Sequence, residues 1–335
     1  MSLLWLTVLA LASTAVIWKA SELLESASQR LALYYGLPAV VQGAVIVAVG
    51  SSFPELSSVV LSVLRHNTFD LGVGAIVGSA IFNILIIPGV SALRSSPLEV
   101  NRDIVYKEGQ FYMLAIAILL LTFSFGVIYN TETSSLTAEL SRPLVLIPIG
   151  MYGLYLFIQY QDVSDYEPPV DPPKESVGRE WLKLGLSLAL IVIAVEGLVV
   201  AALGFGEALN TPDFLWGLTI VAAGTSLPDA FVSIRAADKG RGEVSVANVL
   251  GSNTFDLLVV IPIGVLLVGS TTVNYALAVP MMGVLTFATV ILFTAMRTEL
   301  QITRLEGIVL LCGYGIFVLW LGVETLGLID TLPGV

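Results

Sequence analysis

The chain has 335 residues, of which 56% are hydrophobic and only 12% are charged, and its formal net charge is −11. Soluble globular proteins carry roughly a quarter charged residues, so this composition excludes an ordinary soluble domain and indicates a membrane protein. The acidic balance argues against nucleic acid as a partner. A single cysteine excludes a disulfide framework and a cysteine-based zinc site. The single histidine, His66, lies in a short polar connection and is interpreted as a solvated loop residue.

Polar residues divide the chain into apolar runs of the length that crosses a bilayer, which is about 20 residues. The runs predict ten transmembrane helices, at residues 2–24, 38–64, 71–95, 106–128, 142–160, 182–208, 212–236, 244–268, 274–296 and 304–327. The first run lacks the positively charged start of a signal peptide and is interpreted as a helix of the mature chain. We therefore expect an all-α membrane protein.

The longest polar stretch, residues 161–180, is rich in proline and aspartate and is predicted to be a linker. It separates a first transmembrane half-repeat, 1–160, from a second, 181–335, within one transport domain. An N-terminus outside the cell would place 13 basic residues in cytoplasmic loops and 2 in external loops. We therefore expect an integral protein of the plasma membrane with a cytoplasmic linker. Five helices per half give the two halves opposite orientations.

Two motifs occur once in each half of the chain. Residues 43–55 and 217–229 align without gaps, with seven of the thirteen positions identical, and Gly78–Asn83 aligns with Gly251–Asp256. Inverted repeats are a recurring construction of secondary transporters, which bind their substrate where the repeats meet. The repeat therefore predicts alternating access to a central site.

The first motif places glycine and proline in the middle of a predicted helix. Both residues weaken or interrupt helices, so we expect a break in each repeat that frees carbonyl oxygens, with those of Ala48 and Ala222 as the candidates. Hydroxyl residues, Ser51 and Thr225, precede the acid of each motif by four positions. Carboxylate, hydroxyl and carbonyl oxygens can then face one point.

Three acids fall near the midpoints of predicted helices: Glu55, Asp229 and Asp256. A charged side chain at the bilayer centre costs roughly 2.5–3.5 kcal/mol or more, and no lysine or arginine lies at the same depth. Either a cation compensates these charges or the acids are protonated, and coordination of a cation is the expectation. Two further acids, Glu22 and Glu196, recur symmetrically nearer the helix ends and are interpreted as structural or access-path residues.

The second motif adds polar groups spaced four residues apart, and therefore on one helix face. The pairs are Ser79 with Asn83 and Ser252 with Asp256. Small residues that permit close helix approach accompany them: Gly74, Gly78 and Gly251. All of the candidate ligands are oxygens, which hard cations such as calcium prefer.

These motifs resemble those of the cation/calcium exchanger superfamily, and specifically the sodium/calcium exchangers. The resemblance rests on Gly50–Glu55 with Gly78–Asn83 and on Gly224–Asp229 with Gly251–Asp256. It implies electrogenic exchange of sodium for calcium, with ions held between the second, third, seventh and eighth helices. It also implies no enzymatic activity, no cofactor and no obligate protein partner, so that inorganic cations and lipid are the expected partners.

The resemblance implies a role for each matching residue. Glu55 and Asp229 are similar to the central carboxylates that calcium and sodium share. Hydroxyls similar to the flanking sodium ligands are those of Ser51, Ser52, Thr225, Ser226, Ser79 and Ser252. Asn83 and Asp256 resemble a second tier, in which Asp256 binds sodium or potassium. The carbonyls of Ala48 and Ala222 complete the set.

Two features depart from the common prokaryotic pattern. The second motif ends in aspartate at position 229 instead of glutamate, which shortens that arm by one methylene. The segment Gly242–Asp256 resembles the potassium-dependent exchangers more closely, so potassium co-transport is a hypothesis.

Three other functions compete with sodium/calcium exchange. A proton-coupled calcium antiporter also uses paired acids, but the sodium-site hydroxyls and Asn83 favour sodium. An intramembrane aspartyl protease needs a Gly-X-Gly-Asp element, which does not occur here. A channel fits the duplicated, interrupted helices less well than alternating access does.

Overall fold

The computed structural model describes residues 2–35, 48–129, 136–162 and 177–325, together with 328 and 332. In the first half the α-helices are α1 (Leu3–Tyr34), α2 (Ala48–Ser51), α3 (Phe53–Leu64), α4 (Phe69–Arg94), α5 (Gly109–Ile128) and α6 (Arg142–Asp162). In the second half they are α7 (Val177–Leu209), α8 (Asp213–Trp216), α9 (Ala222–Asp238), α10 (Gly242–Phe255), α11 (Ile261–Val268), α12 (Tyr275–Arg297) and α13 (Arg304–Thr325). Three segments are π-helical: η2 (Ile104–Glu108), η3 (Gly217–Val221) and η4 (Asp256–Val260).

Nine continuous helical stretches of the described residues are long and apolar enough to cross a membrane. Helix α3 is a shorter apolar helix within the remaining predicted span, 38–64. The ten-helix membrane fold predicted from the sequence is therefore confirmed. The ends of two helices were wrong, because α1 continues to Tyr34 and α7 begins at Val177.

Both of these helices are too long to lie wholly within hydrocarbon. At 1.5 Å per residue, the 32 residues of α1 and the 33 of α7 extend roughly 50 Å, beyond a core of about 30 Å. Their charged turns can therefore lie outside the apolar layer. Helices α6 and α7 also extend into the expected linker, of which 163–176 lies outside the described residues.

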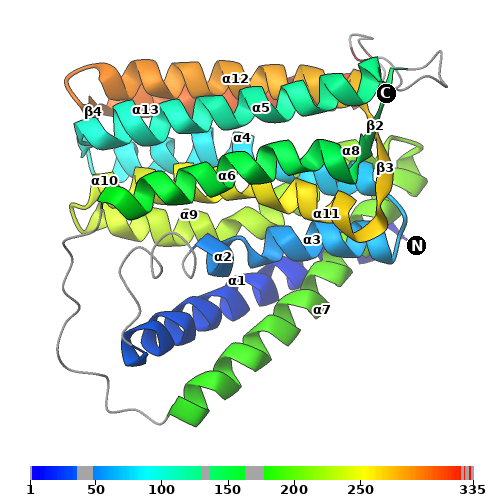
Figure 1. Cartoon of the computed structure of the whole chain (residues 1–335), viewed down its shortest axis with the longest axis horizontal. Coiled ribbons are helices and arrows are strands. Elements are labelled where there is room, and N and C mark those ends of the chain that lie inside the picture. The colour runs from blue at the N-terminus through cyan, green and yellow to red at the C-terminus, as the bar shows by residue number, and fades with distance from the viewer. Residues whose placement is uncertain are drawn as a thin grey trace.

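Most helices run side by side along the long axis of the molecule, whereas α1 and α7 lie at an angle along one side (Figure 1). The buried apolar residues form two clusters. The larger joins α3, α4, α5, α10 and α12. The smaller joins α1 and α7 with Leu71 and Ala75 of α4 and Val221 of η3. The two oblique helices thus share an apolar core of their own.

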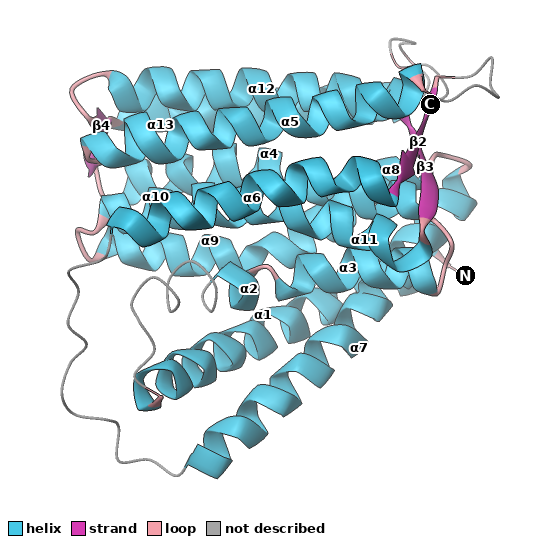
Figure 2. Cartoon of the chain, in the orientation of Figure 1, coloured by secondary structure: helices cyan, strands magenta, loops and turns pink. Residues whose placement is uncertain are grey.

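Two short antiparallel sheets mark opposite ends of the molecule (Figure 2). At one end β1 (Leu98–Glu99) pairs with β4 (Gln301–Ile302), with Leu98 opposite Ile302. At the other end β2 (Thr137–Ser141) pairs with β3 (Ser270–Asn274), and the register runs from Thr137 opposite Asn274 to Ser141 opposite Ser270. Each sheet pairs one strand of the first repeat with one strand of the second.

Helix α4 is the most deeply buried of the membrane-spanning helices. A Cβ atom at Gly74 or Gly78 would overlap backbone atoms of α8 or η3, and one at Gly217 would overlap the backbone of α4. The predicted close approach is therefore confirmed at Gly74 and Gly78. No described atom lies within 4 Å of a Cβ built at Gly251. Gly251 is the repeat counterpart of Gly78, which contacts Leu218. The repeat counterpart of Leu218 is residue 44, which lies outside the described residues.

Candidate cation-binding site

The two proline motifs have different local structures. In the first repeat α2 ends at Ser51 and α3 begins at Phe53, so the predicted interruption is confirmed there. In the second repeat α9 runs through Pro228 without a break, so the predicted interruption is wrong. A proline inside a helix removes one backbone hydrogen bond and does not have to end the helix. Here the irregularity is π-helical, in η3, and a further π-helical segment begins at Asp256. Such segments are frequent at functional sites.

The three acids predicted from the sequence are all buried. Glu55 on α3, Asp229 on α9 and Asp256 at the start of η4 are each 1% exposed. Among the described residues nothing donates a full hydrogen bond to either oxygen of any of them. The three interact electrostatically with one another, yet they do not form a compact cluster that could hold a metal ion by itself. A buried carboxylate without a partner is costly, so a charged group here needs a compensating cation, and a proton is the alternative.

Hydroxyl groups approach these carboxylates from the opposite repeat. The pairs are Thr225 with Glu55, Ser51 with Asp229 and Ser52 with Asp256. Ser252 also approaches Asp229, from its own repeat. Along the sequence, Ser51 and Thr225 each lie four residues before the acid of their own motif. The structure instead interleaves the two motifs, so the candidate ligands belong to both halves at once.

A second group of hydroxyls lies between α4 and α9. The Ser226 hydroxyl oxygen is 2.7 Å from the Ser79 hydroxyl oxygen and 2.7 Å from the Ala222 carbonyl oxygen. Thr225 donates to the carbonyls of Val221 and Ala222 at 3.1 and 3.3 Å. The Ala222 carbonyl therefore accepts from both hydroxyls within its own helix. Its counterpart Ala48 begins α2, next to residues outside the described ranges.

Asparagine side chains connect the two copies of the second motif. Asn83 Nδ2 donates to Asn253 Oδ1 at 3.0 Å, and both residues are fully buried. Asn83 Oδ1 has no hydrogen-bond partner among the described residues. The sequence reasoning missed Asn253, because its counterpart in the first repeat is Ala80 and it lies outside the four-residue spacing. Its position within the duplicated motif was the available signal.

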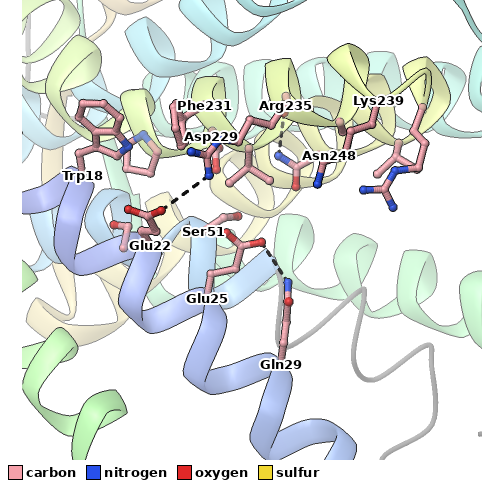
Figure 3. Close-up of a pocket in the computed structure, with 17 residues that line it drawn as sticks. Trp18, Glu22, Glu25, Gln29, Ser51, Asp229, Phe231, Arg235, Lys239 and Asn248 are labelled. Carbon is pink, nitrogen blue, oxygen red and sulfur yellow. Dashed lines mark hydrogen bonds and ion pairs between the residues drawn. The ribbon is translucent and has the colours of Figure 1, made fainter. Parts of the chain in front are cut away.

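A pocket of about 580 Å³ reaches Asp229 and Ser51 from one end of the molecule. Its wall comes from α1, α2, α9 and α10, and Figure 3 shows Glu22 of α1 paired with Arg235 of α9 across it, while Glu25 bonds to Gln29 of its own helix. Glu22 and Lys239 are exposed at its rim. The pocket thus connects one buried carboxylate with the surface.

The symmetric acids Glu22 and Glu196 take part in ion pairs at opposite ends of the site. Glu22 pairs with Lys19 at 3.1 Å and with Arg235 at 3.7 Å, and its side chain is 45% exposed. Glu196 is 17% exposed, forms an ion pair with Arg65 at 3.0 Å and lies at hydrogen-bond distance, 3.1 Å, from His66 Nε2. The interpretation of His66 as a solvated loop residue was therefore wrong, because it contacts the repeat counterpart of Glu22.

The fold and the site together define a membrane protein with an acidic site buried between two repeats. The family model described as "Sodium/calcium exchanger protein" matches residues 5–161 and 180–323. The chain belongs to this family.

Individual proteins agree with the family. The chain is 29% identical to sodium/calcium exchanger MaX1 of Methanosarcina acetivorans, over 89% of this chain and 93% of the relative. It is 30% identical to the putative antiporter CaxA of Alkalimonas amylolytica, over 89% and 92% of the two chains. A solved structure of the sodium-calcium exchanger NCX_Mj has a TM-score of 0.63 at 23% identity and covers 95% of this chain and 99% of that one, which shows the shared fold.

Proposed function

We propose that the chain exchanges sodium for calcium by alternating access, without a chemical reaction or a cofactor. The proposal is carried by three buried carboxylates that no basic residue of the described chain neutralises and that hydroxyl groups of both repeats surround. Calcium accepts six to eight oxygen ligands in a flexible geometry, which suits such a mixed set. The relative named sodium/calcium exchanger MaX1 supports the choice of sodium.

Each candidate ligand has a role in this proposal. Glu55 and Asp229 hold calcium, or sodium in its place, while Asn83 and Asp256 form a second tier for monovalent cations. Flanking oxygens come from the hydroxyls and carbonyls of Ser51, Ser52, Thr225, Ser226, Ser79, Ser252, Ala48 and Ala222. Their approach to the carboxylates across the repeat interface supports these roles.

Electrostatics couples the two ions. Up to three negative charges lie in the site, and calcium with one monovalent cation, or several sodium ions, can neutralise them. An empty site leaves those charges buried and unpaired, which is costly in a low-dielectric interior. The interconversion of the two access states is therefore slow without bound ions, and this restriction enforces exchange.

The moving part is the pair α1 and α7. These helices share the smaller apolar core, and α7 presents glycines where α1 crosses it: Gly197 faces Ser13 and Gly204 faces Leu6. Gly224, in the motif of α9, lies against Thr14 of α1 and so leaves room for the helix to pass. Small residues permit this close approach of the helices, and in this proposal the pair slides past the site along that contact.

The charge distribution assigns a direction to the pocket. The basic residues at its rim, Arg235, Lys239 and Arg241, belong to the loops that the positive-inside rule places in the cytoplasm. We therefore interpret the structure as inward-facing, in a plasma membrane, with the N-terminus outside and the linker inside. On this interpretation the Glu196 ion pairs close the external end.

Replacement of Glu196 by glutamine should weaken the closure of the external end. An ion pair with one exposed partner, here Arg65, contributes about 0.2–1 kcal/mol, so we expect half-saturation by external calcium to become about 1.4- to fivefold tighter. The calcium concentration that half-saturates transport from the cytoplasmic face should increase. Calcium uptake into vesicles of defined sidedness measures both. Unchanged half-saturation values from both faces in Glu196→Gln would contradict the proposed closure of the external end.

Imposed ion gradients decide which cation drives calcium. We expect a sodium gradient across proteoliposomes to drive calcium flux at least about tenfold faster than a pH gradient of equal free energy, because hydroxyl oxygens bind sodium and not protons. Calcium isotope uptake is the measurement. Flux driven by pH alone would favour the proton-coupled alternative. Adding potassium to both faces tests the potassium hypothesis raised by Asp256, and equal rates would reject it.

A further inference from the structure

We propose that Asn253 is a positioning residue that holds the Asn83 amide with its oxygen toward the transported cations. This inference rests on the proposed function, because it takes Asn83 as a ligand. An asparagine amide has an accepting end and a donating end of nearly equal size. Only the oxygen end can bind a cation, so something must hold it in one orientation.

The orientation follows from an acceptor that cannot change its role. Asn253 Nδ2 lies 3.3 Å from the Ala80 carbonyl oxygen and 3.2 Å from the Tyr112 hydroxyl. A backbone carbonyl only accepts, so the amino end of Asn253 must face Ala80. Its oxygen then faces Asn83, which must donate from Nδ2. Asn83 Oδ1 is thereby directed away from Asn253, and it is the buried oxygen that has no partner in the described residues.

The far end of this chain of contacts is also held. Tyr112 is fully buried and interacts with the Thr289 hydroxyl, which donates to the Leu285 carbonyl at 2.7 Å. The series runs from a backbone carbonyl of α12 through α5 and α10 to α4. Because Thr289 gives its proton to a carbonyl, it accepts from Tyr112, which in turn accepts from Asn253, so the network agrees with one orientation of the Asn83 amide.

The repeat explains why only one half needs this device. Asn253 contacts its own repeat counterpart, Ala80, so this contact lies where the two halves meet. The counterpart of Asn83 is Asp256, whose two oxygens are equivalent when it is ionised. A carboxylate presents an oxygen in either orientation, whereas an amide does not. The Asn253 side chain therefore orients the amide of Asn83, which belongs to the other repeat.

A double-mutant cycle tests this assignment. Wild type, Asn83→Ala, Asn253→Ala and the double variant are compared in proteoliposomes by the sodium concentration that half-maximally drives calcium efflux, together with the maximal rate. We expect about a tenfold increase in half-maximal sodium for Asn83→Ala and about fivefold for Asn253→Ala, with maximal rates within about twofold. Because Asn253 acts through Asn83, the double variant should be no worse than Asn83→Ala.

The outcomes separate the two proposals. No effect of Asn83→Ala would overturn its role as a ligand and the inference with it. An effect of Asn83→Ala without one of Asn253→Ala, or two effects that multiply in the double variant, would overturn the positioning role alone. If Asn253→Ala does not fold, Tyr112→Phe is tested in its place. It should raise the half-maximal sodium concentration about twofold. An unchanged half-maximal sodium concentration in Tyr112→Phe would contradict the network. Thr254→Val is the matched control, because that hydroxyl donates only within its own helix, to the Leu250 carbonyl at 2.7 Å, and its sodium dependence should be unchanged.

Discussion

Glu55→Gln should abolish calcium exchange. The glutamate is 1% exposed and neither oxygen has a hydrogen-bond partner among the described residues, so its charge is available to a cation. Glutamine has nearly the same shape but no charge and only one oxygen. Removing one charge from a buried ion site costs about 3 kcal/mol or more, which corresponds to about a hundredfold loss of calcium affinity.

Sodium-driven calcium isotope flux in proteoliposomes measures this effect, with calcium binding to the purified protein as a second readout. Glu207→Gln provides the matched control, since Glu207 is exposed at the end of α7, and it should exchange at the wild-type rate. Exchange at the wild-type rate by Glu55→Gln would refute its place in the central site.

Gly78→Ala should disrupt the packing that brings the two repeats together. A Cβ at this position would overlap the Leu218 carbonyl group and lie 2.8 Å from the Ala222 Cβ. Backbone cannot move aside as a flexible side chain can, so α4 and η3 must separate. We expect a loss of about 1–3 kcal/mol of stability or more. Transport should fall at least about tenfold, because η3 leads directly into the motif of α9.

Thermal unfolding of the purified protein and calcium flux measure the two effects of Gly78→Ala. Gly283→Ala is the control, because it lies on α12 with no atom within 4 Å of the added Cβ among the described residues. Unchanged melting temperature and flux for Gly78→Ala would show that the helices tolerate a wider separation, contrary to the packing described above.

Much of this protein follows from the sequence, because the bilayer imposes strict rules on a chain. About 20 apolar residues are needed for each crossing and a buried carboxylate is expensive, so both leave a clear signal. The ten helices, the repeat and the acids at positions 55, 229 and 256 were all identified in this way. The ends of α1 and α7 were not, since polar residues that leave the hydrocarbon layer can continue a helix.

The tertiary structure alone decided how the two halves interact. Thr225 approaches Glu55 and Ser51 approaches Asp229 because the repeats interlock, and spacing along one helix contains no information about a contact with another helix. The same holds for Asn253, whose counterpart is an alanine, and for the pairing of His66 with Glu196. The sequence by itself determined which oxygens are expensive to bury, since that is a local property. Which groups they face is a property of the packed repeats.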